Sequence, residues 1–251
     1  MRFFLVDAFT GEAFRGNTAA VVLLDGPADP AWMQSVAAEF KHPETAFAEL
    51  GGREVPLRWF TPKTEVELCG HATLAAGHVL KGEQEFDTLS GTLTTKSDNG
   101  WVYMDFPADP PEETGEDIPL DVTAEYVGRG VSDILVQVAD TARLRALEPD
   151  FKALAALETR AIIVTAPGDK PGIDFVSRVF APAVGIDEDP VTGSAHCTLT
   201  SYWAPKLGKE RMVAEQASER GGIVRVSLTE NEYRLRLAGQ AVTVASGELH
   251  V

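Results

Sequence analysis

Two short stretches of the sequence combine residue types that can bind anions and move protons. Residues 68–74 read LCGHATL, and residues 189–196 read DPVTGSAH. In each stretch a Gly is followed by an imidazole or hydroxyl side chain and then by Ala. Carboxylates, imidazoles and thiols are groups that proteins use as general acids and bases. The two stretches therefore suggest one chemical site that is assembled from two related segments.

Both glycines stand where a strand pattern gives way to a helical pattern. Gly70 precedes HATLAAGHVL, and Gly193 precedes SAHCTLTSYWAPKL. A helix N-terminus leaves backbone N–H groups unpaired and carries about half a positive charge. A glycine there lets a ligand approach the backbone closely. We therefore expect Gly70 and Gly193 to contribute the two sides of a carboxylate-binding site.

The segments around these stretches also repeat. RWFTP at 58–62 and RVFAP at 178–182 share Arg, Phe and Pro at an offset of 120 positions. Strand, helix and hairpin patterns follow in the same order in both halves, which predicts an internal duplication. We expect an α+β fold with an N-terminal half (1–112) and a C-terminal half (118–251). The cleft between the halves is the expected ligand site.

Two segments complicate this division. Residues 107–119 are rich in Pro and acidic residues, a composition that is typical of a linker. The last strand pattern, from about residue 241 to residue 251, can cross back and pack on the first half.

Composition excludes several classes of partner. The chain has 251 residues, 44% of them hydrophobic, and a formal charge of −16 from 22 basic and 38 acidic residues. Such a surface repels nucleic acids and anionic membranes. No apolar stretch of about 18 residues predicts a membrane span, and the N-terminus lacks a signal-peptide pattern. We expect a cytoplasmic protein that binds an anionic small molecule through a local positive site.

Several longer phrases carry a family resemblance: DAFTGEAFRGNTAAVVLL, KHPETAF, FTPKTEVELCGHATLAAG, GIDEDPVTGSAH and GQAVTVASGELHV. They occur in the order found in the PhzF family of phenazine-biosynthesis-like isomerases, which this sequence resembles over most of its length. The resemblance implies a diaminopimelate epimerase-like fold. That fold has two pseudo-symmetric halves, each a curved mixed β-sheet wrapped around a central helix. It also implies a cofactor-independent enzyme, without a metal, that forms a homodimer.

The resemblance also nominates site residues. Glu44, in KHPETAF, would carry the proton, and the whole expected set comprises catalytic Glu44, His71 and Asp189 and substrate-binding Gly70, Gly193 and Ser194. One carboxylate can take a proton from one carbon and return it to another on the same face, which is an isomerisation. For this role we expect the pKa of Glu44 to be raised toward neutrality by burial or by Asp189.

The two cysteines bear on an alternative mechanism. Racemases and epimerases of the related fold use two cysteines, one at the start of each central helix. Cys69 occupies the first of these positions, but its counterpart before Gly193 is Thr192, whose hydroxyl is too weak an acid for the task. Cys197 lies about one helical turn further on and is expected to be a buried apolar residue.

Three functions therefore remain open. The first is a proton-shifting isomerase that resembles trans-2,3-dihydro-3-hydroxyanthranilate isomerase. The second is a racemase or epimerase that uses Cys69 with an unconventional partner. The third is a non-catalytic protein that binds a small molecule or acts as a scaffold. The substitution Cys69→Ser separates the first two, because only the racemase needs the thiol.

Overall fold

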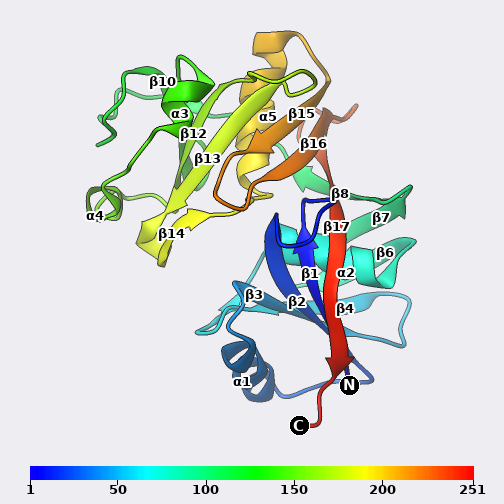
Figure 1. The fold of residues 1–251 in the computed structure, drawn as a ribbon. Helices are drawn as coiled ribbons and strands as arrows, with labels where there is room; N and C mark the ends of the chain where they lie inside the picture. Colours follow the sequence, from blue (N-terminus) through cyan, green and yellow to red (C-terminus); the bar gives the residue numbers. More distant parts are fainter. The chain divides into compact units, whose positions relative to one another are not determined.

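The computed structural model describes residues 1–251 and divides into two compact units. Unit 1 comprises Met1–Asp105 together with Ala238–Val251, and unit 2 comprises Phe106–Leu237. The last strand, β17 (Arg234–Glu248), begins in unit 2 and ends in unit 1, where it runs beside the first strand (Figure 1).

Unit 1 is built on mostly antiparallel strands with two helices. Its strands are β1 (Arg2–Ala8), β2 (Asn17–Leu24), β3 (Glu44–Glu49), β4 (Val55–Phe60), β5 (Glu65–Val66), β6 (Glu83–Thr88), β7 (Gly91–Asp98) and β8 (Trp101–Pro107). Strand β1 pairs antiparallel with both β2 and β17, whereas β2 and β3 are parallel. The parallel pair needs a crossover, which helix α1 (Pro30–Phe40) provides.

The helices of unit 1 begin where the sequence predicts. Helix α1 follows Asp29, whose side chain accepts a hydrogen bond from the N–H of Ala31 at 2.9 Å, with Pro30 in the first position. Helix α2 (Gly70–Leu80) is buried over most of its length and packs against strands β1, β2, β3, β6 and β7. Its small residues, such as Ala72, Ala75 and Ala76, allow the strands to approach it closely.

Unit 2 has its own strands and helices. The strands are β9 (Glu112–Glu113), β10 (Ala124–Arg129), β11 (Asp133–Val138), β12 (Ala161–Pro167), β13 (Phe175–Ala181), β14 (Ile186–Asp189), β15 (Arg211–Gln216) and β16 (Gly222–Leu228). The helices are α3 (Thr141–Arg145), α4 (Phe151–Leu154), the 3₁₀ turn Pro182–Val184 and α5 (Ala195–Leu207). The stretch TARLRALEPDFKALAAL (141–157) forms two short helices on either side of Pro149, because proline interrupts helical hydrogen bonding.

The same order of strand pairing occurs in both units. In unit 1, β2 is parallel to β3, which is antiparallel to β4, and β4 is antiparallel to β5. In unit 2, β11, β12, β13 and β14 pair in the same sequence of directions. Helix α5, like α2, follows this strand series and is largely buried.

The repeated Arg-x-Phe-x-Pro segments perform the same structural task in each unit. Arg58 makes two hydrogen bonds of 2.7 and 2.8 Å to Glu65 and lies over the ring of Phe60. Arg178 makes two of 2.8 Å to Glu188 and lies over the ring of Phe180. Such paired contacts hold one strand to the next. The repeat in the sequence therefore corresponds to a repeated strand-to-strand contact.

The predicted linker is not a free tether. Within residues 107–119, Asp109 accepts hydrogen bonds from the Thr198 hydroxyl at 2.6 Å and the Val131 N–H at 2.9 Å. Glu116 makes two bonds of 2.8 Å to Arg129, and Ile118 packs against the core of unit 2. The linker prediction was wrong because the acidic residues have partners elsewhere in the unit, which composition alone does not show.

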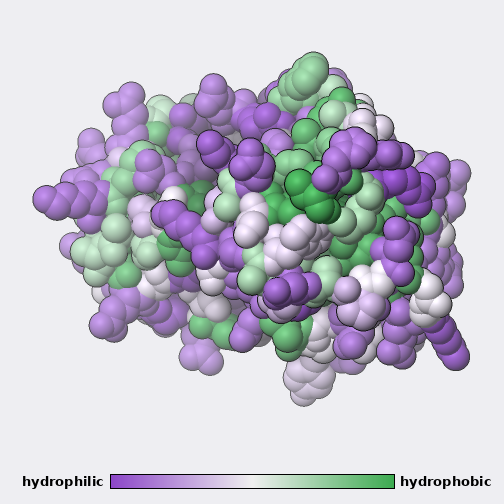
Figure 2. Space-filling view, turned by 90° about the horizontal axis from the view of Figure 1, so that it is seen from below, coloured by the Kyte–Doolittle hydropathy of each residue, from purple (hydrophilic) through white to green (hydrophobic).

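The surface is largely polar on the face that Figure 2 draws. Figure 2 shows hydrophilic residues over much of one face, with hydrophobic side chains in patches between them. The longest helix, α5, has 13 residues, and none of the helices combines the length and hydropathy that crossing a membrane requires.

Candidate active site

The first group of site residues lies in unit 1, where β3 begins beside the start of α2. Glu44 is the first residue of β3, and its side chain is 13% exposed. His71 is the second residue of α2 and is buried, as is Cys69, which immediately precedes the helix. Pro43 precedes Glu44 and favours an extended backbone there. The packing of β3 against α2 therefore brings a carboxylate, an imidazole and a thiol together.

The three side chains form a compact cluster in which the imidazole contacts both of the other groups and the carboxylate and the thiol also lie close together. Nε2 of His71 lies 3.1 Å from Oε2 of Glu44, and Nδ1 of His71 lies 3.5 Å from Sγ of Cys69. Oε2 and Nε2 are both buried, yet neither has a well-aligned hydrogen bond. Catalytic contacts are often loose before substrate binds and become shorter afterwards. These two atoms can therefore still bond to a substrate.

The pKa of Glu44 in this cluster differs from the expected one. Burial alone raises the pKa of Glu44, but the attraction of the His71 imidazolium and hydrogen bonds from the neighbouring side chains outweigh it, so the net pKa is lowered. Burial lowers the pKa of His71, whereas its interactions with Cys69 and Glu44 raise it well above its usual value. The expected upward shift of the Glu44 pKa was wrong because it ignored His71.

The thiol of Cys69 is the neutral member of this cluster. Burial, followed by the negative charge of Glu44, raises the pKa of Cys69. At neutral pH the Glu44 carboxylate is therefore the charge that keeps the proton on His71. The resting state is a carboxylate, an imidazolium and a thiol.

This ion pair makes the stability of unit 1 depend on pH. The folded pKa of Glu44 is depressed, so its contribution is present above its ordinary pKa of 4.5 and is lost as pH falls. The folded pKa of His71 is raised, so its contribution is present below 6.5 and is lost as pH rises through the folded value. Between pH 4.5 and pH 6.5, the free energy of unfolding of the wild-type protein should exceed that of Glu44→Gln by about 2 kcal/mol.

Urea unfolding of both proteins across the pH range measures this difference. The advantage of the wild type should shrink below pH 4.5 and again above the folded pKa of His71. A constant difference between the two proteins at every pH would show that the pair is not charged in this way.

This cluster is less well suited to binding a metal ion than to transferring protons. Glu44, Cys69 and His71 place possible ligand atoms within 4.8 Å of one another. Cys69 and Glu44, however, contact different nitrogens of the same ring. In its imidazolium form His71 carries a proton on both nitrogens and offers no lone pair to an ion. The geometry favours a series of proton donors and acceptors.

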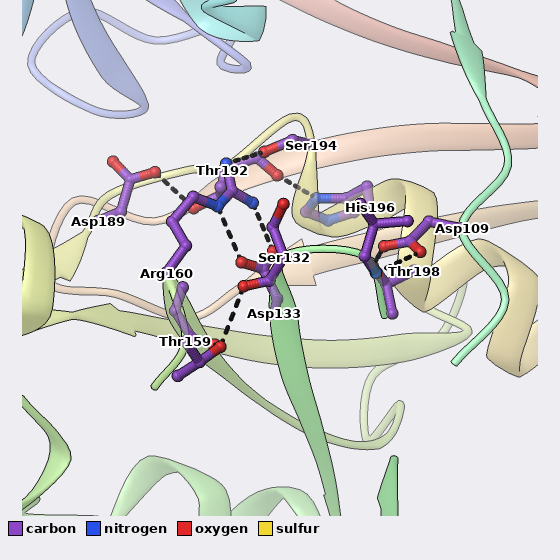
Figure 3. A network of polar contacts seen from close by, with 12 residues as sticks. Asp109, Ser132, Asp133, Thr159, Arg160, Asp189, Thr192, Ser194, His196 and Thr198 are labelled. Atoms are coloured by element: carbon purple, nitrogen blue, oxygen red, sulfur yellow. Dashed lines mark hydrogen bonds and ion pairs between the residues drawn. The ribbon is translucent and has the colours of Figure 1, made fainter. Parts of the chain in front are cut away.

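The second group of site residues lies in unit 2, in the loop from β14 to α5. The Thr192 hydroxyl donates to Asp189 at 2.5 Å, as Figure 3 shows. Gln216, which is fully buried, donates to the Asp189 carbonyl at 2.8 Å and accepts from the Thr192 N–H at 2.9 Å. Nδ1 of His196 contacts the Thr192 carbonyl at 2.8 Å. Buried side chains thus fix the loop that presents Asp189.

Ser194 lies next to a cation that the sequence did not reveal. Nη1 of Arg160 donates to Oγ of Ser194 at 3.0 Å, and Nε donates to the buried carboxylate of Asp133 at 2.8 Å (Figure 3). A second nitrogen of Arg160 also bonds to Asp133. Since the Ser194 oxygen accepts from Arg160, its own O–H can still donate to an anion. Arg160 therefore fixes the position of the Ser194 hydroxyl oxygen.

Sequence reasoning missed Arg160, Asp133 and Gln216 because none lies in a motif. The strand registers of the structure show which position of unit 1 corresponds to the place of Arg160. Thr45 pairs with Phe60 in unit 1, and Ile162 pairs with Phe180 in unit 2. Arg160 therefore stands beside the position in unit 2 that corresponds to Glu44 in unit 1.

The two glycines occupy different places at their helix starts. Gly70 is the first residue of α2, as expected. Regular helix in α5 begins only at Ala195, and a tighter turn precedes it, with the N–H of His196 bonded to the Gly193 carbonyl at 3.0 Å. Glu44, His71 and Gly70 belong to unit 1, and Asp189, Gly193 and Ser194 belong to unit 2. That they serve one cleft stays a prediction.

Comparison with known proteins agrees with this fold. A crystal structure of a PhzF-family phenazine biosynthesis protein from Enterococcus faecalis matches with a TM-score of 0.95 and 38% identity, covering 100% of this chain and 99% of that one. A predicted epimerase from Pseudomonas aeruginosa, at 21% identity and a TM-score of 0.78, covers 100% and 99% and shares the fold. The protein is thus an α+β protein of the PhzF and epimerase-like fold class.

The sequence comparisons define the family. The model of the PhzC-PhzF family, described as phenazine biosynthesis-like protein, matches residues 6–247. An uncharacterized isomerase of Halalkalibacterium halodurans is 46% identical over 98% of this chain and 97% of its own length. This chain belongs to the PhzC-PhzF family, as its motifs predict.

Proposed function

We propose that this protein is a cofactor-independent isomerase that moves a proton within a small carboxylate-bearing substrate. The reaction would resemble that of trans-2,3-dihydro-3-hydroxyanthranilate isomerase. The buried pair of Glu44 and His71 carries the proposal, because an ionised carboxylate with a free lone pair can accept a proton from carbon. Membership of a family with a relative named as an isomerase supports the reaction class.

The proton shift needs only one carboxylate. Glu44 accepts a proton from one carbon of the substrate and returns it to another carbon on the same face. While the proton rests on Glu44, negative charge spreads over the substrate. The N–H of His71 at Nε2 lies beside Glu44 and can donate to that charge. The imidazolium therefore acts as the electrophilic partner of the base.

Residues of unit 2 bind the substrate in this proposal. The Ser194 hydroxyl, held by Arg160, would donate to the substrate carboxylate together with the Gly193 backbone. Asp189 would accept from a polar substituent of the substrate. The backbone of Gly70 would bind a second polar group. The shared topology of the two units supports the pseudo-symmetric arrangement that the family resemblance implies. The resemblance also implies a homodimer, and the proposal places it in the cytoplasm.

A racemase that uses Cys69 is less well supported. Such an enzyme needs a thiol that ionises readily, whereas burial raises the pKa of Cys69. The hydroxyl of the counterpart residue, Thr192, donates a hydrogen bond to Asp189. Neither observation suits a two-thiol mechanism.

Deuterium wash-in tests the proposed function. The protein is incubated in D2O with a panel of small carboxylates that includes the dihydro-hydroxyanthranilate, and mass spectrometry detects the exchange. The wild-type protein and Cys69→Ser should both incorporate deuterium or convert the substrate. Activity that disappears in Cys69→Ser would favour the racemase, and no exchange with any carboxylate would favour a binding protein.

A further inference from the structure

Cys69 stands at a helix start but does not cap the helix. It occupies the residue before α2, where Ser, Thr, Asp and Asn are preferred because their oxygen accepts from the first N–H groups. Its side chain makes no capping bond of normal geometry, although the N–H of Ala72 interacts with the sulfur. Thr73 instead holds the Cys69 carbonyl, through its N–H at 3.0 Å and its hydroxyl at 2.6 Å. The backbone is therefore fixed while the thiol faces His71.

We propose that Cys69 is a positioning residue whose sulfur accepts a hydrogen bond from Nδ1 of His71 and so fixes the imidazole with Nε2 beside Glu44. The proposal rests on the proposed function, in which His71 supports Glu44. It assigns Cys69 a role in which the thiol never exchanges a proton with substrate.

The need for such a residue follows from the chemistry of imidazolium. A protonated histidine has two N–H groups, and a buried N–H without an acceptor costs about 1–3 kcal/mol. Nε2 faces Glu44, so Nδ1 needs an acceptor on its other side. Sγ of Cys69 lies 3.5 Å from Nδ1, within the range of a bond to sulfur.

No other titratable side chain provides an acceptor for Nδ1 of His71. Helix α2 packs against β1, β2, β3, β6 and β7. Of the titratable groups on α2 and these strands, Glu44 and Cys69 are the two that act on His71. The buried thiol is neutral at neutral pH, so it accepts a hydrogen bond without adding a second negative charge beside Glu44.

Titration of His71 by NMR tests the proposal without any substrate. Wild-type protein, Cys69→Ala and Cys69→Ser are compared, and His71→Gln assigns the resonance. Loss of the acceptor in Cys69→Ala should lower the pKa of His71 by about one pH unit. Cys69→Ser keeps an acceptor and should lie between the two. An unchanged titration in folded Cys69→Ala would overturn the proposal.

Two further measurements complete the test. Cys197→Ala removes the other buried thiol, which lies in unit 2, and should leave the His71 titration unchanged. If Cys69→Ala does not fold, the ¹⁵N spectrum of the wild-type protein decides: Nδ1 of His71 should carry a proton at neutral pH. An unprotonated Nδ1 would contradict the direction of the hydrogen bond.

The pH dependence of activity separates this proposal from the proposed function. With His71 more easily deprotonated, Glu44 loses part of its partner charge. The basic limb of the exchange rate in Cys69→Ala should therefore move to lower pH, with Cys69→Ser between Cys69→Ala and the wild type. If the wild type shows no exchange at all, the proposed function fails, whereas the NMR titration still decides the role of Cys69.

Discussion

Glu44→Gln is expected to reduce the rate of substrate proton exchange by roughly 100- to 10,000-fold, the range that a general base contributes. Gln is almost the same size as Glu but cannot accept a proton from carbon. The side chain lies at the start of β3 and is only partly buried, so the variant should still fold. Deuterium incorporation, followed over time by mass spectrometry, measures the change.

Glu49→Gln is the matched control, because Glu49 ends the same strand. It removes the same charge at a position outside the site and should leave the rate unchanged. Equal rates for Glu44→Gln and the wild type, with substrate binding intact, would remove Glu44 from the mechanism and with it the one-base isomerase.

Gly16→Ala is expected to lower the free energy of unfolding of unit 1 by roughly 3 kcal/mol, through strain and steric overlap together. Gly16 has φ of +65°, and an added Cβ would lie 2.1 Å from the Ala8 carbonyl oxygen. Strand β2 begins at the next residue, and its Ala19 pairs with Glu44. A displaced loop therefore disturbs the strand beside the base as well.

Urea unfolding compares this variant with Gly26→Ala. An added Cβ at Gly26 would have no other atom within 4 Å, and Gly26 has no positive φ, so its substitution should change stability by less than about 0.5 kcal/mol. Proton exchange by Gly16→Ala should also fall, because the start of β2 helps to place Glu44. Similar stabilities for the two variants would mean that the loop before β2 tolerates a side chain.

Much of the framework could be predicted because it depends on local signals. Asp29 and Pro30 mark the start of α1, and Gly70 marks the start of α2. Asn99 and Gly100 both have positive φ in the turn between β7 and β8, as an Asn-Gly hairpin requires. Each of these features is set by a few adjacent residues. The order of elements followed from them.

The chemistry of the site could not be predicted in the same way. The lowered pKa of Glu44 depends on His71, which comes from a different element. The anchoring of Ser194 depends on Arg160, which belongs to no motif. Cys69 and Thr192 looked like equivalent positions, but one faces an imidazole and the other a carboxylate. Contacts between distant segments decide these properties, and composition and spacing do not report them.

Label transfer tests the one-base mechanism most directly. A substrate identified by wash-in is labelled with deuterium at the carbon that loses its proton, and the isomerisation is run in H2O. If Glu44 carries the proton and returns it, part of the deuterium should appear at the new carbon of the product, and Glu44→Gln should produce none. Product that contains only solvent hydrogen, formed by an enzyme that needs Cys69, would contradict the single-carboxylate account.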